Sequence, residues 1–189
     1  MNDRPQDKTP GALQRHRMSG IADGIWFRKD GARMRSHEAD EKNRMQTIES
    51  YSPDETFALG ESIGRGAGPG QIYTLTGDLG VGKTVFTQGV AAGLGVAGPV
   101  NSPTFTILQI YEDGRMPFYH FDVYRISDVE EMEEIGYEDC FYGQGVCLIE
   151  WADLIEEILP ECYTEIRIEK DLQKGFDYRK ITITKCDAS

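Results

Sequence analysis

One segment of the chain has the residue types and spacing of a phosphate-binding loop. Residues 77–84 read Gly-Asp-Leu-Gly-Val-Gly-Lys-Thr, a complete G-x-x-x-x-G-K-[ST] pattern. Glycines let the backbone curl so that its N–H groups face phosphates, and the helix that follows directs its positive end to the same place. The Lys83 side chain would reach the β- and γ-phosphates, and the Thr84 hydroxyl would bind Mg²⁺. The spacing therefore predicts a nucleotide site built from Gly77, Asp78, Leu79, Gly80, Val81, Gly82, Lys83 and Thr84.

Two acidic residues stand where buried strands are expected to end. Glu150 directly follows the apolar run Val146–Ile149, the position typical of a Walker B acid, and Asp122 closes the run Phe118–Phe121. A metal-bound triphosphate needs a carboxylate at the end of a neighbouring strand, so we expect at least one of the two to face Mg²⁺. With Lys83 they form the candidate catalytic set. The alternative for each is a surface charge at the end of its strand.

Other features are less specific. Ser102–Thr106 places three hydroxyls around a rigid turn, which suits a nucleotide-sensing loop, although a plain turn fits the spacing equally well. His120 precedes a strand end, a position more typical of a histidine packed in the core than of a catalytic one. Trp151 could pack in the core or contact a partner. The sequence has no Asn-Lys-x-Asp guanine-reading motif, which favours ATP over GTP.

The elements around these residues follow from hydrophobic periodicity and capping signals. The apolar strand 72–76 precedes the loop, and a helix up to Gly95 follows it. A short strand over 47–51 leads into a helix with Ser52 as N-cap, Pro53 at its first position and Glu55 completing a capping box. We also expect strands at 105–111, 118–124, 146–149, 165–169 and 180–184, and helices at 127–134, capped by Ser127, and at 154–159.

This alternation of strands and helices predicts the fold class. It is an α/β three-layer sandwich of the P-loop NTPase type, with a mixed central sheet and helices on both faces. The chain has 189 residues, enough for one such domain. Residues 1–46 hold ten Lys or Arg against seven Asp or Glu and few large apolar residues. We therefore predict a disordered extension over 1–44 and an ATPase domain over 45–189, with Met45 as a candidate translation start.

Charge and composition exclude several function classes. The net charge is −12 overall and −15 over residues 47–189, which argues against a protein that binds nucleic acid by itself. No run approaches the roughly 18 apolar residues of a membrane span. The four cysteines lack a C-x-x-C pair, which indicates reduced thiols rather than a zinc site or disulfide framework. We expect a cytoplasmic protein without membrane contact.

Four motifs in order resemble one known family. They are residues 77–84, then Ser-Pro-Thr-Phe-Thr at 102–106, His-Phe-Asp-Val-Tyr-Arg at 120–125, and Ile-Glu-Trp at 149–151. This order is similar to that of the TsaE (YjeE-like) family of bacterial tRNA threonylcarbamoyladenosine biosynthesis ATPases, and the resemblance covers about residues 46–185. It implies a P-loop ATPase that works with two partner proteins, TsaD and TsaB, and meets tRNA only indirectly. Their joint product is threonylcarbamoylated adenosine beside the anticodon.

The resemblance also implies residue roles. Lys83 and the loop amides would hold ATP, Thr84 and Glu150 would hold Mg²⁺, and Asp122 would be a second essential acid near the metal or the attacking water. Residues 102–106 resemble the family's switch-like segment.

Two further positions come from the family pattern. A threonine of the N-terminal helix near the adenine matches Thr56, and an arginine near the nucleotide matches Arg179. That arginine is paired with a glycine in the family, whereas Phe176-Asp177-Tyr178 separate Gly175 from Arg179 here. Residues 1–44 have no counterpart in the family pattern.

Two other functions remain open at the level of sequence. A P-loop small-molecule kinase needs an acceptor-binding subdomain and an arginine-rich lid, and the five arginines after residue 45 are not clustered. A nucleotide-dependent binding module with negligible turnover would share the phosphate loop. Phosphate release with and without partners separates the ATPase from the binding module.

Overall fold

The computed structural model describes residues 25–27, 33–35 and 45–185. The chain divides into two units, Met1–Glu41 and Lys42–Ser189. In the first unit, β1 (Ile25–Phe27) pairs antiparallel with β2 (Arg33–Arg35). The rest of segment 1–44 lies outside the described residues, as does Cys186, so the expected disorder of that segment stays a prediction.

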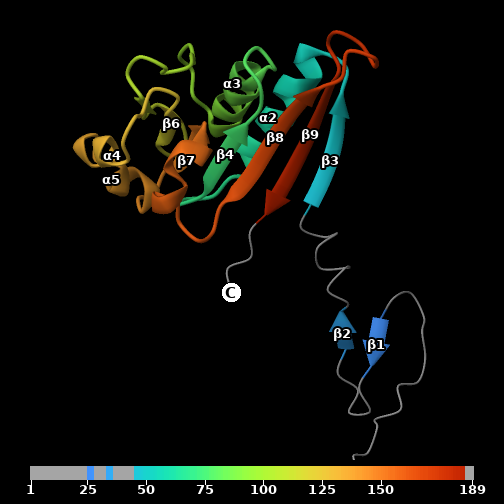
Figure 1. The fold of residues 1–189 in the computed structure, drawn as a ribbon, viewed down its shortest axis with the longest axis horizontal. Helices are drawn as coiled ribbons and strands as arrows, with labels where there is room; N and C mark the ends of the chain where they lie inside the picture. Colours follow the sequence, from blue (N-terminus) through green and yellow to red (C-terminus); the bar gives the residue numbers. More distant parts are fainter. Residues whose placement is uncertain (1–24, 28–32, 36–44, 186–189) are drawn as a thin grey trace, which may run out of the picture. The chain divides into compact units, whose positions relative to one another are not determined.

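The second unit is built on a seven-stranded mixed sheet (Figure 1). Its strand order is β3-β9-β8-β4-β7-β6-β5, and the four neighbours β8, β4, β7 and β6 run parallel. Antiparallel strands flank them, because β5 pairs with β6, β9 with β8 and β3 with β9. The strand bounds are β3 Met45–Ser50, β4 Ile72–Thr76, β5 Leu108–Tyr111, β6 Phe118–Asp122, β7 Val146–Glu150, β8 Thr164–Lys170 and β9 Arg179–Lys185.

Helices cover both faces of this sheet, which confirms the predicted three layers. α2 (Pro53–Gly66) and α3 (Lys83–Leu94) share one core with the strand residues Leu75 and Leu148. On the other face, α4 (Glu130–Glu134), α5 (Tyr137–Phe141) and the 3₁₀-helix η1 (Ala152–Ile158) share a second core with Ile149. Leu148 and Ile149 are both buried because successive side chains of a central strand enter opposite layers.

Helices α2 and α3 touch through their backbones. A Cβ built on Gly64 of α2 would lie 2.1 Å from the Val90 carbonyl oxygen, and one on Gly89 of α3 would lie 2.2 Å from the Phe57 carbonyl oxygen. No side chain fits at either position, so glycines at these sites allow the helices to approach closely. This contact fixes α3, whose first turn carries Lys83, against the rest of the layer.

The N-terminus of α2 has the predicted capping box, and its C-terminus is capped by an arginine from a distant part of the chain. Ser52 Oγ accepts a hydrogen bond from the Glu55 amide at 3.1 Å, while Glu55 Oε2 accepts one from the Tyr51 amide at 2.7 Å. At the other end, Arg115 Nη2 donates to the carbonyl oxygens of Gly64 and Ala67, each at 2.6 Å. These bonds supply side-chain donors to the carbonyls at the helix end, where the Gly64 oxygen also accepts from the Ala67 amide at 3.3 Å, and a cation there interacts favourably with the helix dipole.

Three sequence expectations were wrong at their boundaries. The strand expected from residue 105 begins at Leu108, because the amides of Thr106 and Ile107 both bond the Pro103 carbonyl and close a turn first. The strand expected to reach residue 124 ends at Asp122. Ser127 does not cap α4, because the N-cap is Val129 and the Glu131 side chain accepts from the Ser127 amide instead.

The chain also contains one element that was not expected and another of a different type. The short helix α5 was not predicted from the sequence. Of residues 154–159, expected as a helix, 154–158 belong to the 3₁₀-helix η1, and Leu159 is its C-cap. Among the described residues, no helix has the length and apolar character needed to cross a membrane.

Candidate nucleotide-binding site

The predicted loop connects β4 to α3 at the carboxyl edge of the parallel strands. Its conformation favours glycine at three positions, since Gly77 has φ 146°, Gly80 has φ 73° and Gly82 has φ 106°. A Cβ on Gly77 would also lie 2.4 Å from the Ile168 carbonyl oxygen. Gly82 is the N-cap of α3 and offers no side-chain acceptor to the first turn. The amides at this helix end are therefore available to an anion.

Lys83 is a buried cation beside this loop, only 7% exposed. Its Nζ donates to the carbonyl oxygens of Gly77 at 2.8 Å and Asp78 at 3.3 Å, and it lies 4.6 Å from the centre of the Trp151 ring. It forms no ion pair with a carboxylate in the described part of the chain. A buried ammonium held only by carbonyls and a ring face is arranged to take an external anion.

Asp122 and Glu150 face this loop across one cavity. They are the last residues of the neighbouring strands β6 and β7, pair in register, and are each 3% exposed. The cavity has a volume of about 440 Å³, within the ordinary range for small-molecule sites. It is lined by Leu79, Gly80, Gly82, Lys83, Thr84, Val85, Ser102, Thr104, Asp122, Tyr124, Glu150 and Trp151.

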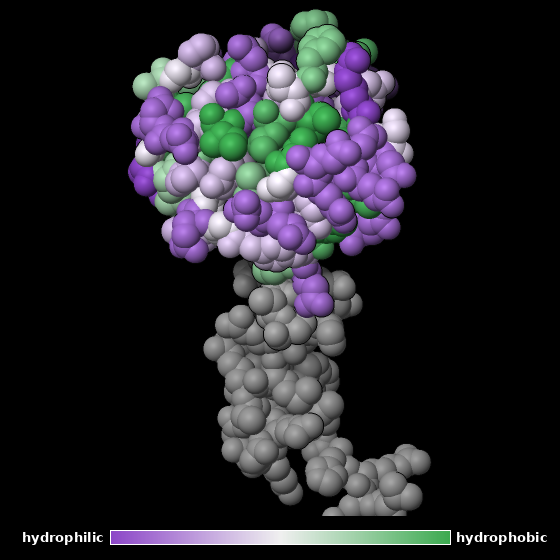
Figure 2. All heavy atoms as spheres, turned by 90° about the vertical axis from the view of Figure 1, so that its left-hand side faces the viewer, coloured by the Kyte–Doolittle hydropathy of each residue, from purple (hydrophilic) through white to green (hydrophobic). Residues whose placement is uncertain are grey.

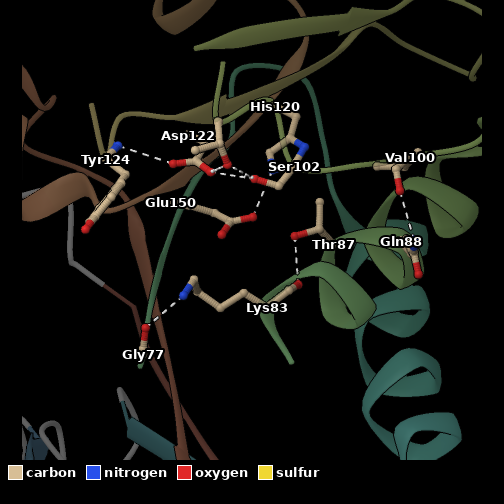
Figure 3. A network of polar contacts seen from close by, with 11 residues as sticks. Gly77, Lys83, Thr87, Gln88, Val100, Ser102, His120, Asp122, Tyr124 and Glu150 are labelled. Carbon is tan, nitrogen blue, oxygen red and sulfur yellow. Dashed lines mark hydrogen bonds and ion pairs between the residues drawn. The ribbon is translucent and has the colours of Figure 1, made fainter. Parts of the chain in front are cut away.

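The Asp122 carboxylate accepts hydrogen bonds from three donors of its own chain. Oδ2 accepts from Ser102 Oγ at 2.5 Å, and Oδ1 accepts from the Tyr124 amide at 3.2 Å (Figure 3). Oδ2 also accepts from Thr104 Oγ1 at 2.6 Å. These bonds compensate for the burial of a charged group. They also hold the segment 102–106 at this end of the sheet, where Ser102 and Thr104 line the cavity.

The Glu150 carboxylate is held on one side only. Its Oε1 is 3.1 Å from His120 Nε2, whereas Oε2 has no hydrogen-bond partner among the described residues. Figure 3 shows the second oxygen directed away from His120, on the side of Lys83. Thr84 lines the same cavity. A free carboxylate oxygen and a hydroxyl are the hard oxygen ligands that Mg²⁺ takes when nucleotide phosphates and water complete its shell, so these residues fit the ion.

The described residues hold no cluster of three or more His, Cys, Asp or Glu able to bind a metal alone.

The remaining predicted residues lie at different distances from the cavity. Leu79, Gly80, Gly82, Lys83 and Thr84 line it, while Gly77, Asp78 and Val81 of the same loop do not. Thr56 does not line it; this residue is buried at the start of α2, with Oγ1 2.8 Å from Ser50 Oγ. Its adenine role stays a prediction.

Arg179 lies against the phosphate-binding loop, since its Nε donates to the Val81 carbonyl at 2.5 Å. The segment before it is tied to β3, because Lys174 Nζ and Tyr178 Oη both donate to Glu49 Oε1, at 2.6 and 2.7 Å. These hydrogen bonds lower the pKa of the exposed Glu49 to about 2. The anchored segment thus keeps Arg179 beside the loop, where its nucleotide-binding role remains a prediction.

Sequence reasoning did not assign three residues of the cavity wall to the site. Val85 and Trp151 directly follow Thr84 and Glu150, and Tyr124 lies two residues after Asp122, so nearness in the chain was the available signal. Trp151 turns into the site through a left-handed backbone, φ 62°, which its residue type does not favour. Its ring packs 5.0 Å from that of Tyr124.

Comparison with known proteins identifies one matching family and several similar proteins. The family described as threonylcarbamoyl adenosine biosynthesis protein TsaE matches residues 50–181. A tRNA threonylcarbamoyladenosine biosynthesis protein TsaE of Bacillus subtilis is 52% identical over 135 residues, which span 71% of this chain and 82% of the relative. The protein of that name from Treponema pallidum is 44% identical over 112 residues, or 59% and 82% of the two chains.

A solved structure agrees with these relatives. The crystal structure of Bacillus subtilis YdiB matches with a TM-score of 0.65 and 43% identity, covering 76% of this chain and 86% of that one. The family match includes the phosphate-binding loop, the segment 102–106 and both acids at the strand ends. This chain therefore belongs to the TsaE family.

Proposed function

We propose that this protein binds and hydrolyses ATP as an accessory component of threonylcarbamoyladenosine biosynthesis in tRNA. The pathway follows from family membership and from the names of the relatives. The observation that supports ATPase activity is the cavity, in which a phosphate-binding loop and its buried lysine face two buried carboxylates. Threonylcarbamoyl transfer itself would belong to a partner enzyme.

The residues divide the work on ATP. On binding, the Lys83 ammonium would exchange the carbonyls of Gly77 and Asp78 for the β- and γ-phosphates, and the amides before α3 would hold the phosphate oxygens. Thr84 and Glu150 would hold Mg²⁺, which when bound neutralises charge on those oxygens. Glu150 suits this role better than Asp122, because one of its oxygens has no partner among the described residues.

Asp122 would act through the segment that it fastens. Its carboxylate receives the hydroxyls of Ser102 and Thr104, which line the cavity opposite the loop. Held there, these hydroxyls can orient the attacking water. A γ-phosphate that contacts them can also change the conformation of the segment at the surface around Phe105, whose side chain is 85% exposed. Asp122 is thus assigned to positioning, and Glu150 to the metal.

The proposed partners are the TsaD and TsaB proteins, in the cytoplasm. The domain of residues 47–189 carries a net charge of −15, which repels tRNA phosphates and favours a protein surface of complementary charge. Among residues 45–185, no arginine side chain donates a hydrogen bond to a residue that lines the cavity; Arg179 donates to the Val81 carbonyl of the loop, which lies outside the lining. Without an arginine finger in place, turnover by the isolated chain should be slow, and such a finger is worth about 10³–10⁵ in rate.

The test is steady-state release of phosphate from Mg-ATP by the chain alone, with the TsaD–TsaB pair, and with tRNA alone. We expect less than about 1 s⁻¹ alone and stimulation by the pair. The Glu150→Gln variant should abolish the stimulated rate and serves as the matched control. Fast turnover alone, or stimulation by tRNA and not by the pair, contradicts the proposal. Absence of release under all conditions would favour the binding module, and label transferred to a small molecule would favour the kinase.

A further inference from the structure

We propose that His120 is a positioning residue that holds the Glu150 carboxylate in its metal-binding orientation. This inference rests on the proposed function, in which Glu150 is the metal carboxylate. It concerns a histidine whose sequence environment favours simple packing and which does not line the cavity.

Strand geometry brings the two side chains together. Asp122 and Glu150 are register partners at the ends of parallel strands, and His120 precedes Asp122 by two residues on β6. Residues two apart on a strand share a face, so His120 lies on the cavity side of the sheet, one step behind the acids. Its Nε2 is 3.1 Å from Glu150 Oε1, and both side chains are almost fully buried, at 0% and 4% exposure (Figure 3).

The surroundings of the ring determine which nitrogen carries the proton. Nδ1 is buried and has no hydrogen-bond partner among the described residues, and the ring stacks on Phe118 with 6.1 Å between centres. A proton on Nδ1 would leave a donor unsatisfied in the core and would turn the Nε2 lone pair toward the carboxylate. A proton on Nε2 avoids both costs. The geometry thus assigns the Nε2–H tautomer, which donates to Glu150.

This bond selects the orientation of the carboxylate. With Oε1 engaged by His120, the remaining oxygen is the one directed to the Lys83 side of the cavity (Figure 3). Asp122 receives three donors from the chain, whereas His120 is the sole described hydrogen-bond donor to Glu150. Removing this donor would leave a buried carboxylate without a partner and free to rotate. Loss of such supporting partners costs about 10- to 100-fold in metal affinity.

The test measures Mg²⁺ binding and not turnover. MgCl₂ is titrated calorimetrically into the full chain saturated with a non-hydrolysable ATP analogue, and analogue binding without Mg²⁺ serves as the control. His120→Phe keeps a ring against Phe118 but has no donor, so its Mg²⁺ midpoint should rise about 10- to 100-fold while Mg²⁺-free binding persists. His120→Gln, whose amide can donate to Oε1, should show a smaller rise.

A double-mutant cycle separates positioning from general damage. Glu150→Gln alone should raise the midpoint, and adding His120→Phe to it should change little, because His120 acts through Glu150. An independent readout is the ¹H–¹⁵N correlation of the His120 ring in the unliganded chain, which should show an unprotonated Nδ1. If His120→Phe does not fold, the cycle is run with His120→Gln.

The possible results distinguish this inference from the proposed function. An unchanged Mg²⁺ midpoint in Glu150→Gln overturns the metal role of Glu150 and this inference with it. A shift in Glu150→Gln without one in His120→Phe overturns the positioning role alone, as would additive effects in the cycle or a protonated Nδ1 with an unprotonated Nε2.

Discussion

At the scale of single residues, the buried charge of Lys83 is the clearest determinant of nucleotide affinity. Hydrogen bonds to charged groups contribute about 1.5–3 kcal/mol, which corresponds to about 10- to 100-fold in affinity. We therefore expect Lys83→Ala to weaken ATP binding by at least that factor in a calorimetric titration. The matched control is Lys180→Ala, because Lys180 is about half-exposed and pairs with Glu169 on the surface. Equal ATP affinity in Lys83→Ala and the parent chain would contradict the assignment of the loop.

The sequence predicts the functional residues of this site better than the hydrogen-bond donors that stabilise them. The motif spacing identifies Lys83, and the ends of apolar runs identify Asp122 and Glu150, because both signals are local in the chain. The donors that make buried acids tolerable come from elsewhere. Ser102 reaches Asp122 across 20 residues and His120 reaches Glu150 across 30, and no local pattern reports such pairings. The structure was needed to find them.

At the scale of elements, the contact between α2 and α3 depends on the absence of side chains. Gly64→Ala would drive a Cβ to 2.1 Å from the Val90 carbonyl oxygen, so the helices must separate. We expect a loss of about 1–3 kcal/mol in the free energy of unfolding, measured by urea denaturation. Gly66→Ala is the matched control in the same helix, with nothing within 4 Å of the added Cβ, and should be neutral or raise stability by up to about 1 kcal/mol. Equal stability of the two variants would show that α2 and α3 adjust without cost.

Elements with strong local signals agree with the sequence, and those shaped by distant contacts do not. Helix α2 begins at the capping box of Ser52, and helix α3 ends at the left-handed Gly95, both as expected, since these signals act within one turn. The five-residue α5 is too short for periodicity to show, and it packs Phe141 into the second core. Residues 154–159 have helical composition, but Ile155 has a non-helical backbone, φ −130°, inside η1. Burial of Ile155 in the second core outweighs local preference there.

At the scale of the whole molecule, strand order brings the site together. The phosphate-binding loop leaves β4, Glu150 ends the adjacent β7, and Asp122 ends β6 beyond it. In open α/β sheets, ligands bind at the carboxyl ends of the strands, where residues from several neighbouring strands meet. Chain order alone does not specify that β7 lies between β4 and β6. Figure 2, viewed from the side of α4 and α5, shows hydrophobic residues within a largely hydrophilic surface, as expected for a domain with a net charge of −15.

The boundary of this unit gives the last prediction. All candidate site residues fall between Thr56 and Arg179, and the ordered sheet begins with β3 at Met45, so a chain that starts at Met45 should melt and bind ATP like the full chain. A chain that starts at Ser52 is the matched control. It loses six ladder pairs between β3 and β9 and the buried Ser50 hydroxyl that meets Thr56, so its melting temperature should fall. Both are measured by thermal unfolding and calorimetric ATP titration. If the Met45 chain lost cooperative melting or ATP binding, residues 1–44 would be part of the folded ATPase rather than an extension of it.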